Sequence, residues 1–238
     1  MKVRRAWALL VAVVAVVLLP RVPFVNVLLL PLAWLGTLVH ESGHALGCLA
    51  VGGEPQSVQV FVNGSGLAPS QLVNPEPWER AVVGISGLVG PAVASAVLLW
   101  LGLGPRLARV GLGLLGVALL AEAALLTQGF ATAVAIGWGL VALLGAWRLH
   151  GEVVRLGVLV VAVQLALHVY RGSGYLFAGV AHTGAGVFPS DVSNVATALG
   201  GHHLMWGVAI GLLDVVLLGV GLLGFFFGDR LLSTRSAD

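Results

Sequence analysis

Seven apolar runs divide the chain, and most of them are about as long as a lipid bilayer is thick. A helix needs about 20 apolar residues to cross a hydrocarbon core of about 30 Å. Charged, proline-rich or glycine-rich breaks separate the runs, and the first run is short, so we expect six to seven transmembrane helices. The runs cover residues 6–19, 24–51, 80–101, 107–127, 130–147, 153–170 and 203–227.

The composition agrees with a membrane protein. The chain is 58% hydrophobic and 9% charged, and its mean hydropathy is +1.02, whereas about a quarter of the residues in a soluble domain are charged. We therefore predict an all-α polytopic membrane protein with a single domain over residues 1–238, placed in a cell membrane as a multi-pass protein. Lys2 is the only lysine beside eleven arginines, which favours a GC-rich bacterial source.

Charge and cysteine content exclude two classes of partner or site. The formal net charge of +2 is small, and the basic residues are scattered, so nucleic acid is not an expected partner. A single cysteine, Cys48, excludes an internal disulfide and a cysteine-based metal cluster.

Two longer polar segments, residues 52–79 and 171–202, interrupt the apolar pattern. In the first, polar and apolar residues alternate through 57–62 and Asn63-Gly64 follows, which predicts a small membrane-associated β-hairpin. Such a hairpin could pair with an extended substrate. In the second, Ser190 or Asp191 after a proline is placed to cap a short helix. Four predicted spans lie between the segments, so both should face the side on which the second span ends.

The stretch "LVHESGHALG", residues 38–47, places ionisable side chains inside the second span. His40 and His44 are four residues apart, so a helix presents both imidazoles on one face, where they can bind one metal ion. This HExxH spacing fits Zn²⁺, and Glu41 would reach a water on the metal as general base. One ionisable residue at the centre of a span costs about 2.5 to 3.5 kcal/mol. A purely structural bridge between helices remains the alternative explanation.

The chain resembles the site-2 protease family of membrane-embedded zinc metalloproteases, in particular its small bacterial branch. The resemblance rests on "LVHESGHALGCLAVGG", "VQVFVNGSG", "ISGLVGPAVAS" and "PSDVSNVATALGGHHLMWG". It implies that His40, His44 and Asp191 bind Zn²⁺ and that Glu41 is the catalytic base. It also implies a β-hairpin beside the site and hydrolysis of membrane-spanning or membrane-proximal polypeptides.

The third ligand is the weakest part of this resemblance. In the better-known pattern the aspartate follows Asn and Pro residues and precedes Gly, whereas Asp191 follows Pro189 and Ser190. Asp214, deep in the last span, is therefore the rival ligand.

Glu122 in the fourth span is expected to be neutral or paired across helices. The histidines in or beside the second polar segment are not assigned as ligands; they are His182, His202 and His203.

Two other classes of function remain open: a membrane metal-ion transporter that uses the His/Glu helix, and a non-catalytic membrane scaffold. Zinc permeases with an HE-containing helix add an acidic residue after the second histidine, but Ala45 and Leu46 follow His44 here. The intact Glu41 argues against a scaffold.

Overall fold

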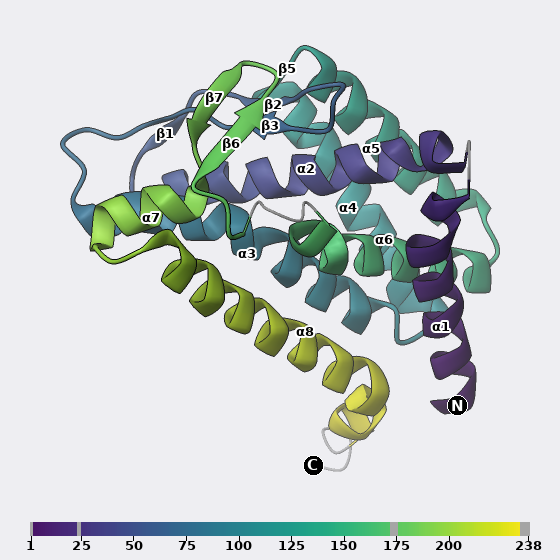
Figure 1. Cartoon of the computed structure of the whole chain (residues 1–238). Coiled ribbons are helices and arrows are strands. Elements are labelled where there is room, and N and C mark those ends of the chain that lie inside the picture. The colour runs from purple at the N-terminus through teal and green to yellow at the C-terminus, as the bar shows by residue number, and fades with distance from the viewer. Residues whose placement is uncertain (1, 23–24, 172–175, 234–238) are drawn as a thin grey trace.

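The computed structural model describes residues 2–22, 25–171 and 176–233 (Figure 1). Within these ranges, seven helices are long and apolar enough to cross a membrane, by length and composition, which confirms the predicted all-α polytopic architecture. These spans lie in α1 (Lys2–Leu18), α2 (Val25–Ala50), α3 (Pro77–Leu101), α4 (Pro105–Leu125), α5 (Phe130–Arg148), α6 (Gly151–Arg171) and α8 (His203–Ser233).

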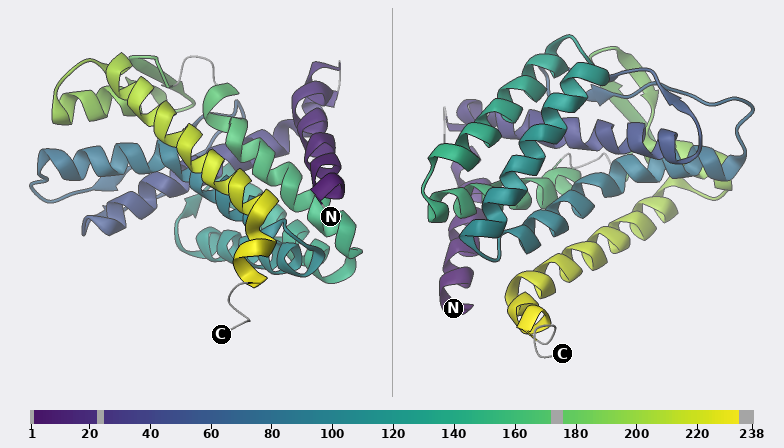
Figure 2. Two further views of the ribbon diagram at one scale, coloured as in Figure 1. Left: turned by 90° about the horizontal axis from the view of Figure 1, so that it is seen from below. Right: turned by 180° about the vertical axis from the view of Figure 1, so that it is seen from behind.

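Helices α2 and α3 form the centre of the described structure. In Figure 1, α2 lies between the small strands and α3, and α3 also packs against α6 and α8. The view from behind in Figure 2 shows α4 and α5 side by side on the far face. Some buried polar groups are hydrogen-bonded between helices, as a bilayer favours; Ser95 Oγ in α3, for example, donates to the carbonyl of Ala162 in α6 at 2.8 Å. Helix α2, which carries His40 and His44, is thus held from several sides.

The start of α3 is fixed by a capping box. Glu79 Oε2 accepts from the backbone N–H of Glu76 at 2.7 Å, and the Glu76 side chain accepts from the backbone N–H of Glu79. Pro77 occupies the first turn, where a missing N–H costs no helical hydrogen bond. Both carboxylates are therefore used to begin the helix.

The first polar segment forms the predicted hairpin, within a larger arrangement of strands. β2 (Val58–Val60) pairs with β3 (Gly66–Leu67) in antiparallel fashion, and the turn includes Gly64 at φ +88°. β2 also pairs in parallel with β5 (Thr127–Gln128), which follows α4, so β2 is the central strand and β3 is an edge. A second pair joins β1 (Glu54–Pro55) to β4 (Ser70–Gln71).

The second polar segment contains a hairpin that the sequence analysis missed. β6 (Val180–Thr183) pairs with β7 (Gly186–Pro189), and α7 (Asp191–Leu199) follows, as predicted for a short helix. Ser190 is its N-cap, since its Oγ accepts from the backbone N–H of Ser193 at 3.3 Å.

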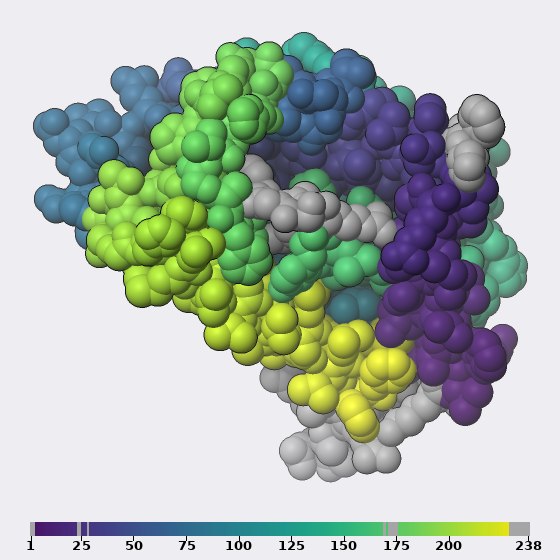
Figure 3. All heavy atoms as spheres, in the orientation of Figure 1, coloured from purple at the N-terminus to yellow at the C-terminus, as the bar shows by residue number. Residues whose placement is uncertain are grey.

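The two polar segments lie together, as the even number of intervening spans predicts. The backbone N–H of Gly184, between β6 and β7, donates to Ser65 Oγ at 3.0 Å, and Gly184 also packs against the ring of Phe61. Figure 3 shows the green β6–β7 hairpin against the blue segment around residue 60. Both segments therefore lie on the same side of the described structure.

Candidate metal centre

Helix α2 presents His40 and His44 on one face, one turn apart. Both are buried, and their rings meet edge to face with 4.8 Å between centroids. Their Nε2 atoms lie 3.2 Å apart. His44 Nδ1–H donates to the carbonyl of Val83 in α3 at 2.8 Å, which fixes the tautomer and leaves the Nε2 lone pair available to a metal ion.

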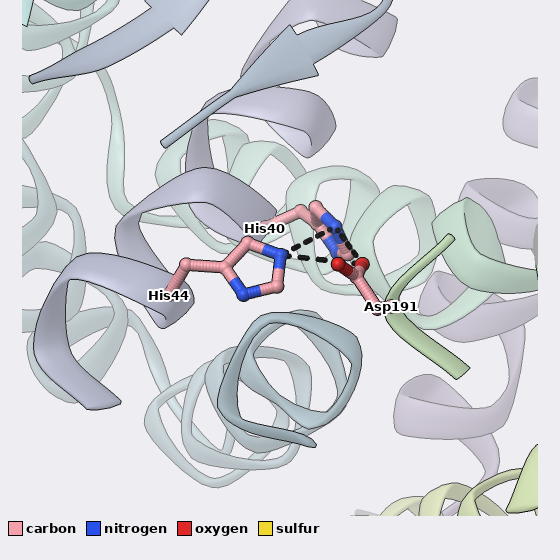
Figure 4. A group of neighbouring side chains, drawn as sticks. All are labelled: His40, His44 and Asp191. Atoms are coloured by element: carbon pink, nitrogen blue, oxygen red, sulfur yellow. Dashed lines mark hydrogen bonds and ion pairs between the residues drawn. The ribbon is translucent and has the colours of Figure 1, made fainter. Parts of the chain in front are cut away.

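Asp191 approaches the same point from the first turn of α7. Its Oδ2 lies 3.1 Å from His40 Nε2 and 3.2 Å from His44 Nε2, as Figure 4 shows. Burial alone would raise the pKa of the Asp191 carboxyl, but the adjacent imidazoles of His44 and His40 hold it well below its usual range. Because Ser190 caps the helix, the Asp191 carboxylate can point towards the histidines.

These three side chains match the geometry of a tetrahedral metal site. Zinc bonds of about 2.0 to 2.1 Å keep neighbouring ligand atoms about 3.3 Å apart. The three separations of 3.1, 3.2 and 3.2 Å are close to that value. Within the described residues, this is the one group of three or more metal-ligating side chains whose atoms converge. Two imidazoles and one carboxylate are a typical catalytic zinc set.

Glu41 is adjacent to His40 in the sequence and lines a cleft of about 640 Å³ together with His44 and Asp191. It is buried, and a side chain at Gly66 in β3 would overlap its carboxylate, since a Cβ there would lie 2.3 Å from Glu41 Oε1. The edge strand β3 is therefore in direct contact with the proposed base. The cleft is bordered by β3, the start of α3, α7 and the β6–β7 hairpin.

A family model, described as Peptidase M50B-like, matches residues 7–221. The chain belongs to this family. The match confirms the resemblance to the site-2 proteases and shows a metallopeptidase family for a multi-pass membrane protein. No curated protein and no solved structure matches the chain.

In this Peptidase M50B-like chain, the structure separates the two rival aspartates. Asp191 joins the histidines, whereas Asp214 lies in α8 outside the group. Asp214 is 1% exposed, and neither of its carboxylate oxygens has a hydrogen-bond partner among the described residues. The histidines in or beside the second polar segment also lie outside the group; they are His182, His202 and His203.

Two polar features near the site extend the sequence analysis. Glu122 in α4 is paired across helices, as predicted, and its Oε1 lies 2.6 Å from the hydroxyl of Ser42, the residue after Glu41. His168 in α6 was missed: its ring lies against Gly36 and is 6.4 Å from the His40 ring, centroid to centroid. The sequence did contain a signal for His168, because an ionisable residue within an apolar span indicates a functional or structural role.

Gly87 in α3 provides the surface on which the His44 ring rests. A Cβ at this position would lie 2.2 Å from two ring atoms, so any larger residue must displace the imidazole. Gly90, one turn further along α3, has only ordinary contacts for a Cβ, at 3.4 Å or more. The two glycines thus form a matched pair for testing the position of His44.

Gly87→Ala should weaken zinc binding because the added methyl group moves the His44 imidazole, whereas Gly90→Ala should retain it. Loss of support for a ligand typically costs about 10- to 100-fold in metal affinity. Competition with a chromophoric zinc chelator, in purified protein of verified folding, measures the difference. Equal zinc affinity in the two variants would contradict the proposed role of the Gly87 surface.

Proposed function

We propose that this protein is an intramembrane zinc metalloprotease that hydrolyses peptide bonds of membrane-spanning or membrane-proximal polypeptides. The observation that supports this most strongly is the convergence of His40, His44 and Asp191, two of which line one cleft together with Glu41. Membership of a metallopeptidase family agrees with it.

His40, His44 and Asp191 would hold the metal through two imidazole nitrogens and one carboxylate oxygen. Bound zinc would act as a Lewis acid on the peptide carbonyl and lower the pKa of a water to about 7. Val83 keeps His44 in the tautomer that this role requires. The Asp191 carboxylate contributes negative charge, which a buried dication needs.

Glu41 would act as the general base. Its carboxylate takes a proton from the attacking water while the water oxygen bonds to the carbonyl carbon. When the C–N bond breaks, Glu41 returns that proton to the leaving amine nitrogen. Its position next to His40 in α2 and against β3 keeps the carboxylate within the cleft.

The edge strand β3 offers a backbone against which an extended substrate can pair. From the sequence, we expected residues 57–67 as a whole to provide this edge. Within these residues β2 is paired on both sides, so only β3 is suited to pair with a substrate. A proline at Gln59 would break the sheet and would not test substrate pairing. β3 also contacts Glu41 through Gly66, so a paired peptide would pass beside the base.

Glu41→Gln should retain about one zinc per chain and lose nearly all proteolysis, because the amide keeps the shape of the side chain and removes its basicity. His40→Ala and His44→Ala should lose both zinc and activity, since two ligands are too few for a stable site. Metal analysis and cleavage of a membrane-anchored reporter measure these outcomes. Zinc flux into vesicles without cleavage by the wild-type protein would instead indicate a transporter.

Asp191→Ala should lower the zinc content and abolish cleavage, whereas Asp214→Ala should keep the metal and at least part of the activity. The reason is that Asp191 lies 3.1 and 3.2 Å from the two histidine nitrogens, and Asp214 lies outside the group. Zinc content per folded chain provides the measurement. The reverse result would place the third ligand in α8 and reduce Asp191 to a neighbour of the site.

A further inference from the structure

The cleft lined by Glu41 has one side chain of fixed positive charge. Among the described residues that line it, the ionisable ones are Glu41, His44, Asp191 and Arg80. Arg80 belongs to the first turns of α3, is exposed, and has no role in the metal site. Its place on the wall of the cleft calls for a separate explanation.

Arg80 has no acidic partner within the described parts of the chain. No ion pair or side-chain hydrogen bond of Arg80 is formed there. The carboxylates of Glu76 and Glu79 are nearest in sequence, but both are engaged in the capping box that begins α3. The guanidinium group is therefore available to a ligand in the cleft.

Apart from the four ionisable residues, the cleft lining is uncharged, and most of it is apolar. Helix α7 buries Val192 and Val195 and exposes Asn194 and Thr197, which line the cleft. With zinc in place, the metal's two positive charges and the carboxylates of Glu41 and Asp191 would cancel. Arg80 would then leave the cleft with a net positive charge, which favours an anionic ligand.

The position of Arg80 sets its distance from the reacting bond. Arg80 lies three residues before Val83, whose carbonyl accepts a hydrogen bond from His44. Three helical residues correspond to about 4.5 Å along the α3 axis, towards the N-terminus of that helix. Its long side chain adds several ångström to this reach. An extended peptide advances about 3.3 Å per residue. A peptide bound in the cleft would therefore place about two or three of its residues between the metal ligands and the guanidinium group of Arg80.

We propose that Arg80 selects substrates with a carboxylate about two or three residues from the scissile bond. This inference rests on the proposed function, because it assigns a substrate class to the same cleft. Aspartate, glutamate or a free C-terminus of a polypeptide would supply the carboxylate, and arginine can bind it through two parallel hydrogen bonds. A lipid phosphate is the competing partner for an arginine near a membrane surface.

The first measurement uses binding and does not depend on turnover. Zinc-loaded Glu41→Gln protein in phosphatidylcholine nanodiscs is incubated with a synthetic peptide mixture in which one position carries Asp, Asn or Lys. Retained peptides are then counted by mass spectrometry. We expect Asp peptides to be retained about fivefold better than Asn peptides, the ratio that an exposed ion pair at the upper end of its range provides.

Substitutions in the same Glu41→Gln background identify the residue responsible. Arg80→Gln should reduce the Asp-to-Asn ratio to about one, Arg80→Lys should keep part of it, and Arg80→Glu should favour Lys peptides. Arg106→Gln is the matched control, because Arg106 is an exposed arginine in the first turn of α4 outside the cleft. Arg106→Gln should leave the ratio unchanged.

The possible results separate the inference from the proposed function. An unchanged Asp-to-Asn ratio in Arg80→Gln would overturn the inference. A change in peptide retention that appears only after anionic lipid is added, and that is equal for the Asp, Asn and Lys peptides, would also overturn it. The latter would assign Arg80 to lipid phosphate. Wild-type protein then receives the same mixture: cleavage of no peptide with zinc bound would overturn the proposed function, and this readout is independent of the binding ratios.

Discussion

The mutual contact of His40, His44 and Asp191 is the interaction on which the rest of this structure depends. Polar groups inside a membrane-spanning bundle are costly unless they satisfy one another or bind a ligand. Here two imidazoles and a carboxylate lie within 4.8 Å of one another and are largely buried. The contact joins α2 to the segment before α8, which are far apart in the sequence. A metal ion at this point would bind the two parts of the chain together.

The elements around this contact keep the ligands in place. The carbonyl of Val83 orients one ring, the flat surface at Gly87 supports it, and Ser190 caps α7 so that the Asp191 carboxylate can face the histidines. The β3 strand closes over Glu41 at Gly66. In this arrangement Glu41, His44, Asp191 and the edge strand β3 line one cleft, which agrees with the proposed hydrolysis of an extended peptide.

Local patterns predicted much of this arrangement, and long-range contacts account for what they missed. Hydrophobic run length predicted the spans, the i, i+4 spacing predicted the histidine pair, and a cap at Ser190 or Asp191 predicted the start of α7. Periodicity did not predict that β5, after α4, would pair with β2, because that pairing depends on how distant helices pack. The surfaces at Gly66 and Gly87 and the proximity of His168 depend on packing in the same way.

X-ray absorption at the zinc edge, on purified protein with one equivalent of Zn²⁺, tests the central claim most directly. The account predicts a four-coordinate site with scattering from two imidazoles, further light ligands at about 2.0 to 2.1 Å and no sulfur. In Asp191→Ala, this four-coordinate spectrum should be lost. A sulfur shell at about 2.3 Å, scattering from no imidazole, or an unchanged spectrum in Asp191→Ala would contradict a zinc centre built from His40, His44 and Asp191.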